Sequence, residues 1–249
     1  MFYRRFSSSL AAVALALTLG AASFATGVKE IPTDKTIKTQ RNAVVSEPLN
    51  LAVLLQDDLV SQVGNELDRT ADFIRSLPNG STVMVAYITS GSLQVRQPFT
   101  PDLDKAARSL RVPRANVSAA PFNPYVEVIE ALRLFKENDK GKNAILLISD
   151  GLDTSRGFDS TSAAHTLDLE RAISKANKSG VAVYAFYAPT VGLTSYNQIA
   201  ASYGQSSLDR LANDTGGKAF FQGTTGFVSF DPYFRSLTRT LNEQYARAF

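Results

Sequence analysis

The chain has 249 residues, of which 44% are hydrophobic, and it carries 26 basic and 23 acidic side chains. This composition suffices for a sizeable buried core and favours one domain over two. The absence of cysteine excludes disulfides, thiolate metal sites and a cysteine nucleophile. The formal charge of +3, without a basic run interleaved with aromatic residues, gives no indication of nucleic-acid binding.

The first 25 residues have the pattern of a secretory signal peptide. A basic pair at residues 4–5 precedes an apolar run at 10–19, and small residues follow. The run is short for a membrane span, and an uncleaved anchor or a buried helix is the alternative. We therefore predict export to the periplasm, the cell surface or the outside, with no membrane span after cleavage. Residues 26–47 are then a linker or N-terminal arm, and 48–249 form the folded domain.

Six short apolar runs predict strands. They are residues 49–55, 82–88, 93–99, 144–148, 181–188 and 219–221. The second and third are joined by Thr89-Ser90-Gly91-Ser92, which is typical of a hairpin turn and makes one strand antiparallel, at an edge of the sheet. Because strands otherwise alternate with helices, we predict an α/β fold with a doubly wound, mostly parallel six-stranded sheet and helices on both faces.

Helices are predicted where apolar residues recur every three or four positions. The predicted ranges are 63–77, 101–112, 124–135, 169–176, 208–212 and 230–248. Two polar stretches, 155–166 and 189–207, are predicted as loops that lie over the binding edge of the sheet and shape its specificity.

Oxygen-bearing side chains gather at three junctions before helices. They are Asp57, Asp58 and Ser61 after the first strand, Asn123 before a helix, and Asp150 and Asp153 after strand 144–148. Such hard ligands suit magnesium, manganese or calcium rather than zinc. They are also ordinary helix caps, and capping is the favoured interpretation for Asn123. For Asp150 beside Asp57 a functional role is favoured, because two close carboxylates repel each other unless a cation or a proton lies between them.

Several stretches resemble von Willebrand factor type A (VWA) domains. They are Leu51-Ala-Val-Leu-Leu55 with Asp57-x-Leu59-x-Ser61, and Ile145-Leu-Leu-Ile-Ser-Asp-Gly151. The tail, 208–221 with Leu241-Asn-Glu-Gln-Tyr245, resembles the secreted bacterial subgroup called VWA-related acidobacterial domains. The resemblance covers the chain from residue 48 onward. It implies a Rossmann-like fold with one antiparallel edge strand, and a non-enzymatic binding or adhesion module that captures a protein partner at the carboxyl edge of the sheet.

The resemblance also implies a metal-ion-dependent adhesion site. Three side chains match its ligands and a fourth falls near an expected threonine: Asp57, Ser61, Asp150 and Asn123. Leu59 replaces a serine and offers no oxygen, so the resemblance implies a degenerate site. Asp58 or Asp153 could supply an oxygen instead, directly or through water, and Mg²⁺ or Mn²⁺ is the expected ion.

Two other functions remain open. No nucleophile-elbow, P-loop, dinucleotide-binding or zinc-protease motif occurs, and the only histidine, His165, lies in a polar stretch typical of a surface residue. Gln56-Asp57-Asp58 resembles the acidic pair of receiver and phosphatase-like domains, which predicts a magnesium-dependent phosphoryl-transfer enzyme. The second alternative is a metal-free scaffold whose acidic edge is structural.

Overall fold

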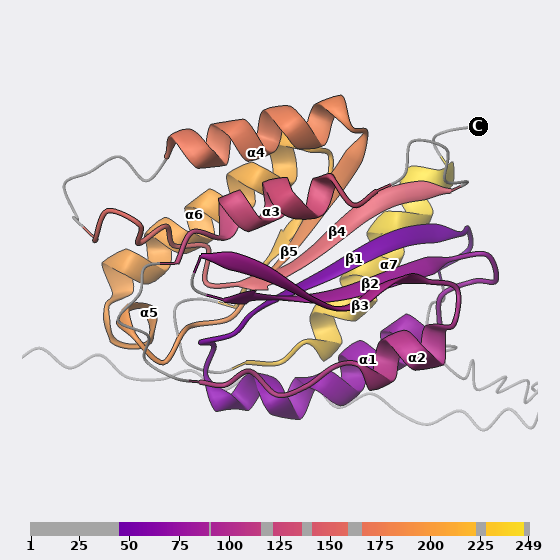
Figure 1. Cartoon of the computed structure of the whole chain (residues 1–249), viewed down its shortest axis with the longest axis horizontal. Helices are drawn as coiled ribbons and strands as arrows, with labels where there is room; N and C mark the ends of the chain where they lie inside the picture. The colour runs from indigo at the N-terminus through magenta and orange to yellow at the C-terminus, as the bar shows by residue number, and fades with distance from the viewer. Residues whose placement is uncertain are drawn as a thin grey trace, which may run out of the picture. The chain divides into compact units, whose positions relative to one another are not determined.

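The computed structural model describes residues 45–89, 91–115, 122–135, 141–158, 166–222 and 228–246. The predicted signal peptide, most of the predicted linker and His165 lie outside these residues. The described residues form a six-stranded sheet with a layer of helices on each face (Figure 1). The predicted fold class is therefore confirmed.

The sheet has the predicted mixed topology. Its strands are β1 (Leu49–Gln56), β2 (Thr82–Thr89), β3 (Ser92–Thr100), β4 (Lys142–Ser149), β5 (Val181–Tyr187) and β6 (Ala219–Phe220). Their order is β3-β2-β1-β4-β5-β6, and among these strands only β3, at one edge, runs antiparallel to its neighbour. The chain leaves β1 toward one edge and returns at β4 to build toward the other. The carboxyl ends of β1 and β4 therefore flank the crevice in which open α/β sheets bind ligands.

The helices divide between the two faces. They are η1 (Ser61–Glu66, a 3₁₀ helix), α1 (Leu67–Arg75), α2 (Leu103–Arg108), α3 (Pro124–Leu132), α4 (Leu167–Lys178), α5 (Leu193–Tyr196), α6 (Gln198–Asp214) and α7 (Asp231–Ala246). One core cluster joins the sheet to α1, α2 and α7, and the other joins it to α3, α4 and α6. Alternate residues of β1, such as Val53 and Leu54, enter opposite clusters, so the strand is a continuous apolar run.

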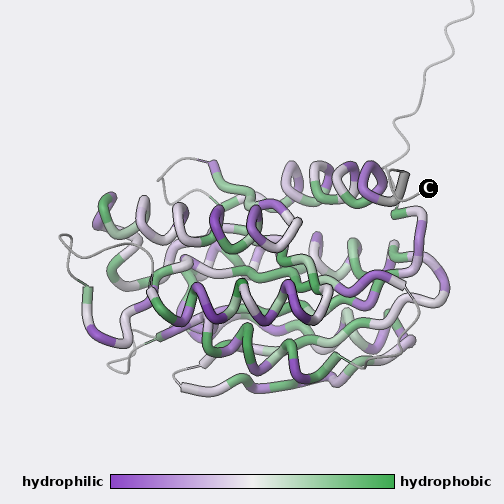
Figure 2. The backbone as a smooth tube through the Cα atoms, turned by 90° about the horizontal axis from the view of Figure 1, so that it is seen from above, coloured by the Kyte–Doolittle hydropathy of each residue, from purple (hydrophilic) through white to green (hydrophobic). Residues whose placement is uncertain are grey.

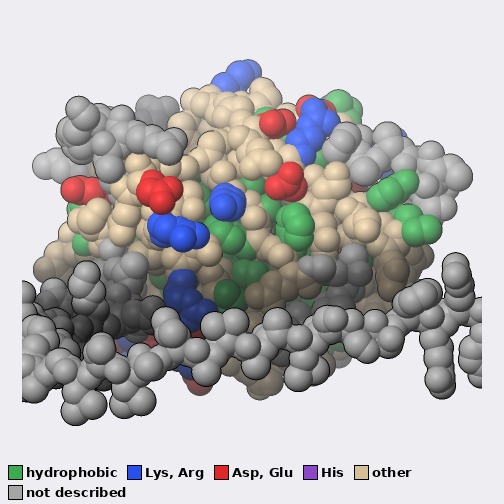
Figure 3. Space-filling model, turned by 180° about the vertical axis from the view of Figure 1, so that it is seen from behind, with side chains coloured by type: hydrophobic (Ala, Val, Ile, Leu, Met, Phe, Trp, Pro, Cys, Tyr) green, Lys and Arg blue, Asp and Glu red, His purple; other side chains and the backbone are tan. Residues whose placement is uncertain are grey.

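The surface follows from this layering. Figure 2 shows hydrophobic residues concentrated in the strands, whereas the helices alternate between hydrophobic and hydrophilic residues. Figure 3 shows small patches of hydrophobic side chains among acidic and basic ones on the face behind that of Figure 1. The longer helices thus bury one side against the sheet and leave the other side to solvent.

The predicted loop at 189–207 is wrong over most of its length. Residues 193–196 form α5, and α6 begins at Gln198, ten positions before the predicted helix 208–212. Asn197 caps α6, because its side chain accepts hydrogen bonds from the backbone N–H groups of Ile199 and Ala200. The buried side of the first turns consists of alanine, glycine, glutamine and serine, so the sequence shows no apolar stripe there.

Candidate functional site

Three loops meet at the crevice beside β1 and β4. The loop after β1 lies against the loop after β5, because the Val60 N–H donates to the Pro189 carbonyl (3.0 Å) and the Val191 N–H donates to the Asp58 carbonyl (3.0 Å). Leu59 and Thr190 form an antiparallel bridge between the same two loops. The loop after β4 contributes Asp150. The sequence prediction that these carboxylates share one edge is thus correct in outline.

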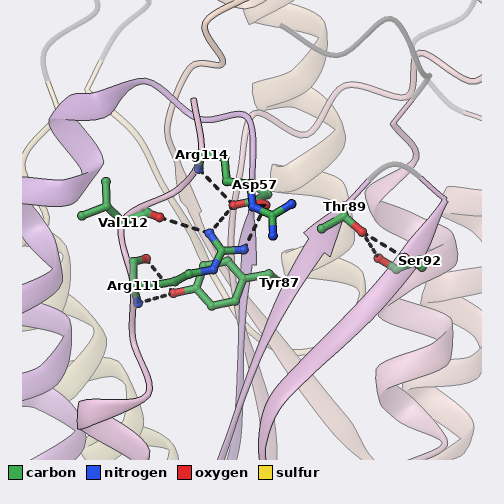
Figure 4. Close-up of polar contacts among 7 residues, drawn as sticks. All are labelled: Asp57, Tyr87, Thr89, Ser92, Arg111, Val112 and Arg114. Atoms are coloured by element: carbon green, nitrogen blue, oxygen red, sulfur yellow. Dashed lines mark hydrogen bonds and ion pairs between the residues drawn. The ribbon is translucent and has the colours of Figure 1, made fainter. Parts of the chain in front are cut away.

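Asp57 is clamped by an arginine (Figure 4). Its side chain is 6% exposed, and Arg111 contacts both carboxylate oxygens, with Nη1 2.5 Å from Oδ1 and Nη2 2.9 Å from Oδ2. The Arg114 N–H also donates to Oδ1 at 3.0 Å, and Arg114 Nε lies 3.5 Å from Oδ2. A fork-to-fork pair of this kind is the strongest ordinary protein ion pair. Asp57 therefore already has a cationic partner within the chain.

Tyr87 fixes the position of Arg111. The guanidinium carbon of Arg111 lies 3.9 Å from the centroid of the Tyr87 ring. The Tyr87 hydroxyl donates to the Arg111 carbonyl (2.7 Å) and accepts from the Arg111 N–H (2.6 Å). The hydrogen bond to Asp57 raises the pKa of Arg111, while burial raises the pKa of Tyr87. The clamp thus holds both the side chain and the backbone of Arg111.

Asp58 and Asp150 form a second group of carboxylates. Gln56 joins them: its Nε2 donates to Asp58 Oδ1 (2.9 Å), and its Oε1 accepts from Ser149 Oγ (2.5 Å) and the Asp150 N–H (3.3 Å). Burial and, less strongly, the negative charge of Asp150 together raise the pKa of Asp58 to about 7. Burial also raises the pKa of Asp150. The expected repulsion between carboxylates therefore lies between Asp58 and Asp150.

Hydroxyl groups surround Asp150. The Thr194 hydroxyl donates to Asp150 Oδ2 at 3.1 Å, and the Leu152 N–H donates to Oδ1 at 3.1 Å. Thr190 Oγ1 lies 3.0 Å from Thr194 Oγ1. Tyr187 is 5% exposed, and its hydroxyl makes no hydrogen bond within the described part of the chain. Burial and, less strongly, the charge of Asp150 raise the pKa of Tyr187.

The other predicted ligands are held elsewhere. Asn123 Oδ1 accepts from the first turn of α3, which confirms its capping role, and its Nδ2 donates to Asp153 (3.2 Å) and Asp168 (2.9 Å). Ser61 begins η1 and is exposed. Leu59 is fully buried in the core cluster on the face covered by α1, α2 and α7. Asn123 thus has other partners, Ser61 is exposed and Leu59 is buried in the core.

The arrangement does not fit the predicted ligand set as it stands. Both oxygens of Asp57 are held by Arg111, and the oxygen of Asn123 is used by α3. Among the described residues no group of three or more Asp, Glu, His or Cys side chains could hold a metal ion. A Mg²⁺ or Mn²⁺ site at this edge stays a prediction, and we derive no chemistry from it.

Sequence reasoning missed four site residues: Tyr87, Arg111, Arg114 and Thr194. Arg111 lies 54 positions from Asp57, and no motif spacing connects them. Asp57 and Asp58 lie in the turn that follows β1, so strand alternation does not predict their directions. Asp57 pairs with Arg111, whereas Asp58 accepts from Gln56.

Large apolar side chains are exposed around the same edge. Eight are exposed in the described residues: Val95, Val112, Val126, Leu134, Leu167, Tyr196, Ile199 and Phe221. Val126, Leu167 and Ile199 lie in the first turns of helices, Tyr196 and Phe221 lie in segments that follow β5 and β6, and Val112 follows α2 beside Arg111. The starts of α3 and α4 meet there, as the contact of Asn123 with Asp168 shows. The edge is therefore bordered by apolar as well as charged groups.

Comparison with solved structures agrees with this fold. An aerotolerance-related membrane protein from Bacteroides fragilis matches with a TM-score of 0.53 and 13% identity, over 78% of this chain and 99% of the other. BatB from Bacteroides thetaiotaomicron matches with a TM-score of 0.53 and 16% identity, over 79% and 99%. The SpRpn10 VWA domain has a TM-score of 0.44 and 14% identity, over 79% and 95%.

Neither the protein-family models nor the curated proteins gave a match to the sequence. The strand order, the antiparallel edge strand and the structural neighbours define the class: the chain has a VWA-type fold. Identities this low indicate the fold alone.

Proposed function

We propose that this protein is an exported VWA-type module that binds a protein partner at the carboxyl edge of its sheet. The observation that carries the proposal is the exposure of large apolar side chains along this edge. Tyr196 is 76% exposed and Ile199, three positions on, is 53% exposed. Clustered apolar groups at a surface mark interaction sites, and tyrosine is among the residues that contribute most to binding.

Site-specific crosslinking tests the proposal. A photoreactive phenylalanine derivative at position 196 or 199, introduced in the native cells, is expected to crosslink the same partner protein from both positions. The matched control is position 178, an exposed lysine at the end of α4 on the opposite edge. With the purified partner, Tyr196→Ser is expected to weaken binding by about tenfold or more. Equal crosslinking from position 178, or none from the edge, would remove the proposal.

Export is tested separately. None of the helices formed by the described residues is long and apolar enough to cross a membrane. We expect the mature protein outside the cytoplasm, with its new N-terminus near residue 25. Cell fractionation with mass spectrometry of the N-terminal peptide measures both, and an intact leader found only in the cytoplasmic fraction would contradict export.

The metal and enzyme hypotheses have their own tests. Calorimetric titration of magnesium and manganese, with Asp150→Ala as the control, measures cation binding, and absence of heat in the wild type would remove the metal hypothesis. A phosphomonoester screen with magnesium tests phosphoryl transfer. The capture of both Asp57 oxygens by Arg111 supports a binding role over a nucleophilic role for that carboxylate.

A further inference from the structure

Two arginines share the carboxylate of Asp57. Arg111 and Arg114 both contact this single carboxylate. Arg96 on β3 is near enough for its charge to lower the pKa of Tyr87, against the stronger effect of burial. Arg96 is exposed and makes no ion pair within the described residues. Two guanidinium groups thus contact the one carboxylate of Asp57, which cannot neutralise both of them by itself.

Arg111 and Arg114 differ in how much of the guanidinium group stays exposed and unpaired. The Arg111 side chain is 22% exposed, and its two terminal nitrogens bind Asp57 and the Val112 carbonyl. The Arg114 side chain is 62% exposed, and its one ion pair to Asp57 runs through Nε at 3.5 Å. Within the described residues, the two terminal nitrogens of Arg114 make no hydrogen bond or ion pair. Arg114 therefore presents an open fork to solvent.

We propose that Arg114 is a receptor for a carboxylate of the protein partner and acts without a metal ion. This inference rests on the proposed function and names the chemistry by which the edge would recognise its partner. An arginine fork accepts a carboxylate through two parallel hydrogen bonds, which gives orientation as well as attraction. The Asp57–Arg111 pair holds the Arg114 backbone in place through the N–H contact at 3.0 Å, so little ordering is needed on binding.

A protein carboxylate fits this position better than a nucleic-acid phosphate. Val112, two positions before Arg114, is 55% exposed, which provides an apolar contact beside the fork. The formal charge of the whole chain is only +3, far from the basic surface that nucleic-acid binding requires. The expected ligand is therefore an acidic side chain flanked by apolar residues.

A peptide titration followed by NMR tests the inference. The probe is a blocked pentapeptide with one glutamate between two leucines, and its matched control replaces the glutamate by glutamine. At millimolar peptide, the Nε–Hε resonance of Arg114 is expected to shift with the glutamate peptide, which binds about tenfold more tightly than the glutamine peptide. Addition of EDTA leaves this binding unchanged.

Two variants localise the effect. Arg114→Gln is expected to reduce the affinity for the glutamate peptide to that for the glutamine peptide. Arg133→Gln is the matched control, because Arg133 is 60% exposed and lies at the opposite edge, past the end of α3. It leaves the affinity unchanged.

The following results would overturn the inference: no shift at millimolar peptide, equal affinity for both peptides, loss of binding in EDTA, or undiminished binding by Arg114→Gln. Equal affinity for inorganic phosphate would show a simple anion site and also overturn it. A partner crosslinked through position 196 that binds Arg114→Gln as tightly as wild type overturns this inference and leaves the proposed function intact. The peptide titration does not depend on crosslinking, so the two failures are distinguishable.

Discussion

The pair formed by Asp57 and Arg111 makes the sharpest stability prediction. Arg111→Met keeps an apolar stem over Tyr87 but leaves a carboxylate that is 6% exposed without its main partner. Removing one member of a buried ion pair lowers the free energy of unfolding by about 3 to 5 kcal/mol. For Arg111→Met we expect a loss of about 3 kcal/mol, because Arg114 keeps its contacts with the Asp57 carboxylate. Asp57→Asn retains an acceptor oxygen and is expected to cost about 1 to 2 kcal/mol.

The double variant decides whether the pair acts as a unit. The double variant Arg111→Met/Asp57→Asn has no buried charge and is expected to lose about 2 kcal/mol of unfolding free energy. The two single variants together lose about 4 to 5 kcal/mol, so the coupling energy is about 2 to 3 kcal/mol. Urea unfolding of the four proteins measures this. The control is Arg133→Met, whose ion pair with Glu130 has both side chains exposed (60% and 42%) and is expected to contribute less than about 0.5 kcal/mol. Additive losses in the cycle would refute the role of Arg111 as the counter-charge of Asp57.

Three further predictions concern the second carboxylate group and α6. The pKa of Asp58 is about 7 in the folded protein against an ordinary value of 3.8. Its protonated form therefore stabilises the fold below pH 4, and this contribution is lost as the pH rises through 7. The difference in pKa limits the contribution to about 4 kcal/mol. At pH 8, Asp58→Asn should therefore be more stable to urea than the wild type, by about 1 to 3 kcal/mol of unfolding free energy, whereas at pH 4 the two should be equally stable. An equal difference in stability at both pH values would contradict this. Gly204→Ala is expected to lower the free energy of unfolding in urea by about 2 to 3 kcal/mol, because the new Cβ would lie 1.9 Å from the Asp150 carbonyl oxygen. This loss is expected although alanine is the better helix former. The exposed Ser206→Ala is the control, and an unchanged stability of Gly204→Ala would be inconsistent with the close approach of α6 to the loop after β4. Asn197→Ala removes the cap of α6 and should lower the thermal midpoint with a loss of about 1 kcal/mol, whereas an unchanged midpoint would argue against the cap.

The fold was predictable because its main signals are local. The apolar run of β1 requires burial on both faces, and the turn Thr89–Ser92 joins two strands, which determines an antiparallel edge. The start of α6 was not predictable in this way. Gly204 and its small neighbours face the loop after β4 at a distance that excludes larger side chains, so the helix lacks the bulky stripe that periodicity detects.

The candidate site was predictable only as far as strand ends determine it. Those ends place Asp57, Asp58 and Asp150 at one edge, but which side chains meet depends on contacts between residues distant in the chain. The partner of Asp57 follows α2, and one hydroxyl donor to Asp150 comes from α5, in a stretch that the sequence presented as a loop. Oxygen donors at strand ends therefore indicate where a site lies before they indicate what it binds.

Leu59 and Arg111 are best understood together. A carboxylate buried as deeply as Asp57 needs a counter-charge, whether a metal ion or a cationic side chain. Magnesium demands several oxygen ligands in near-ideal geometry, and a fully buried leucine at position 59 cannot supply one. A guanidinium requires only the two oxygens of Asp57 and a flat surface, which Tyr87 provides. Leucine at 59 is thus compatible with a buried Asp57 because Arg111 neutralises that carboxylate. Arg114 keeps an exposed guanidinium at the same edge, and the proposal of an acidic partner rests on that group.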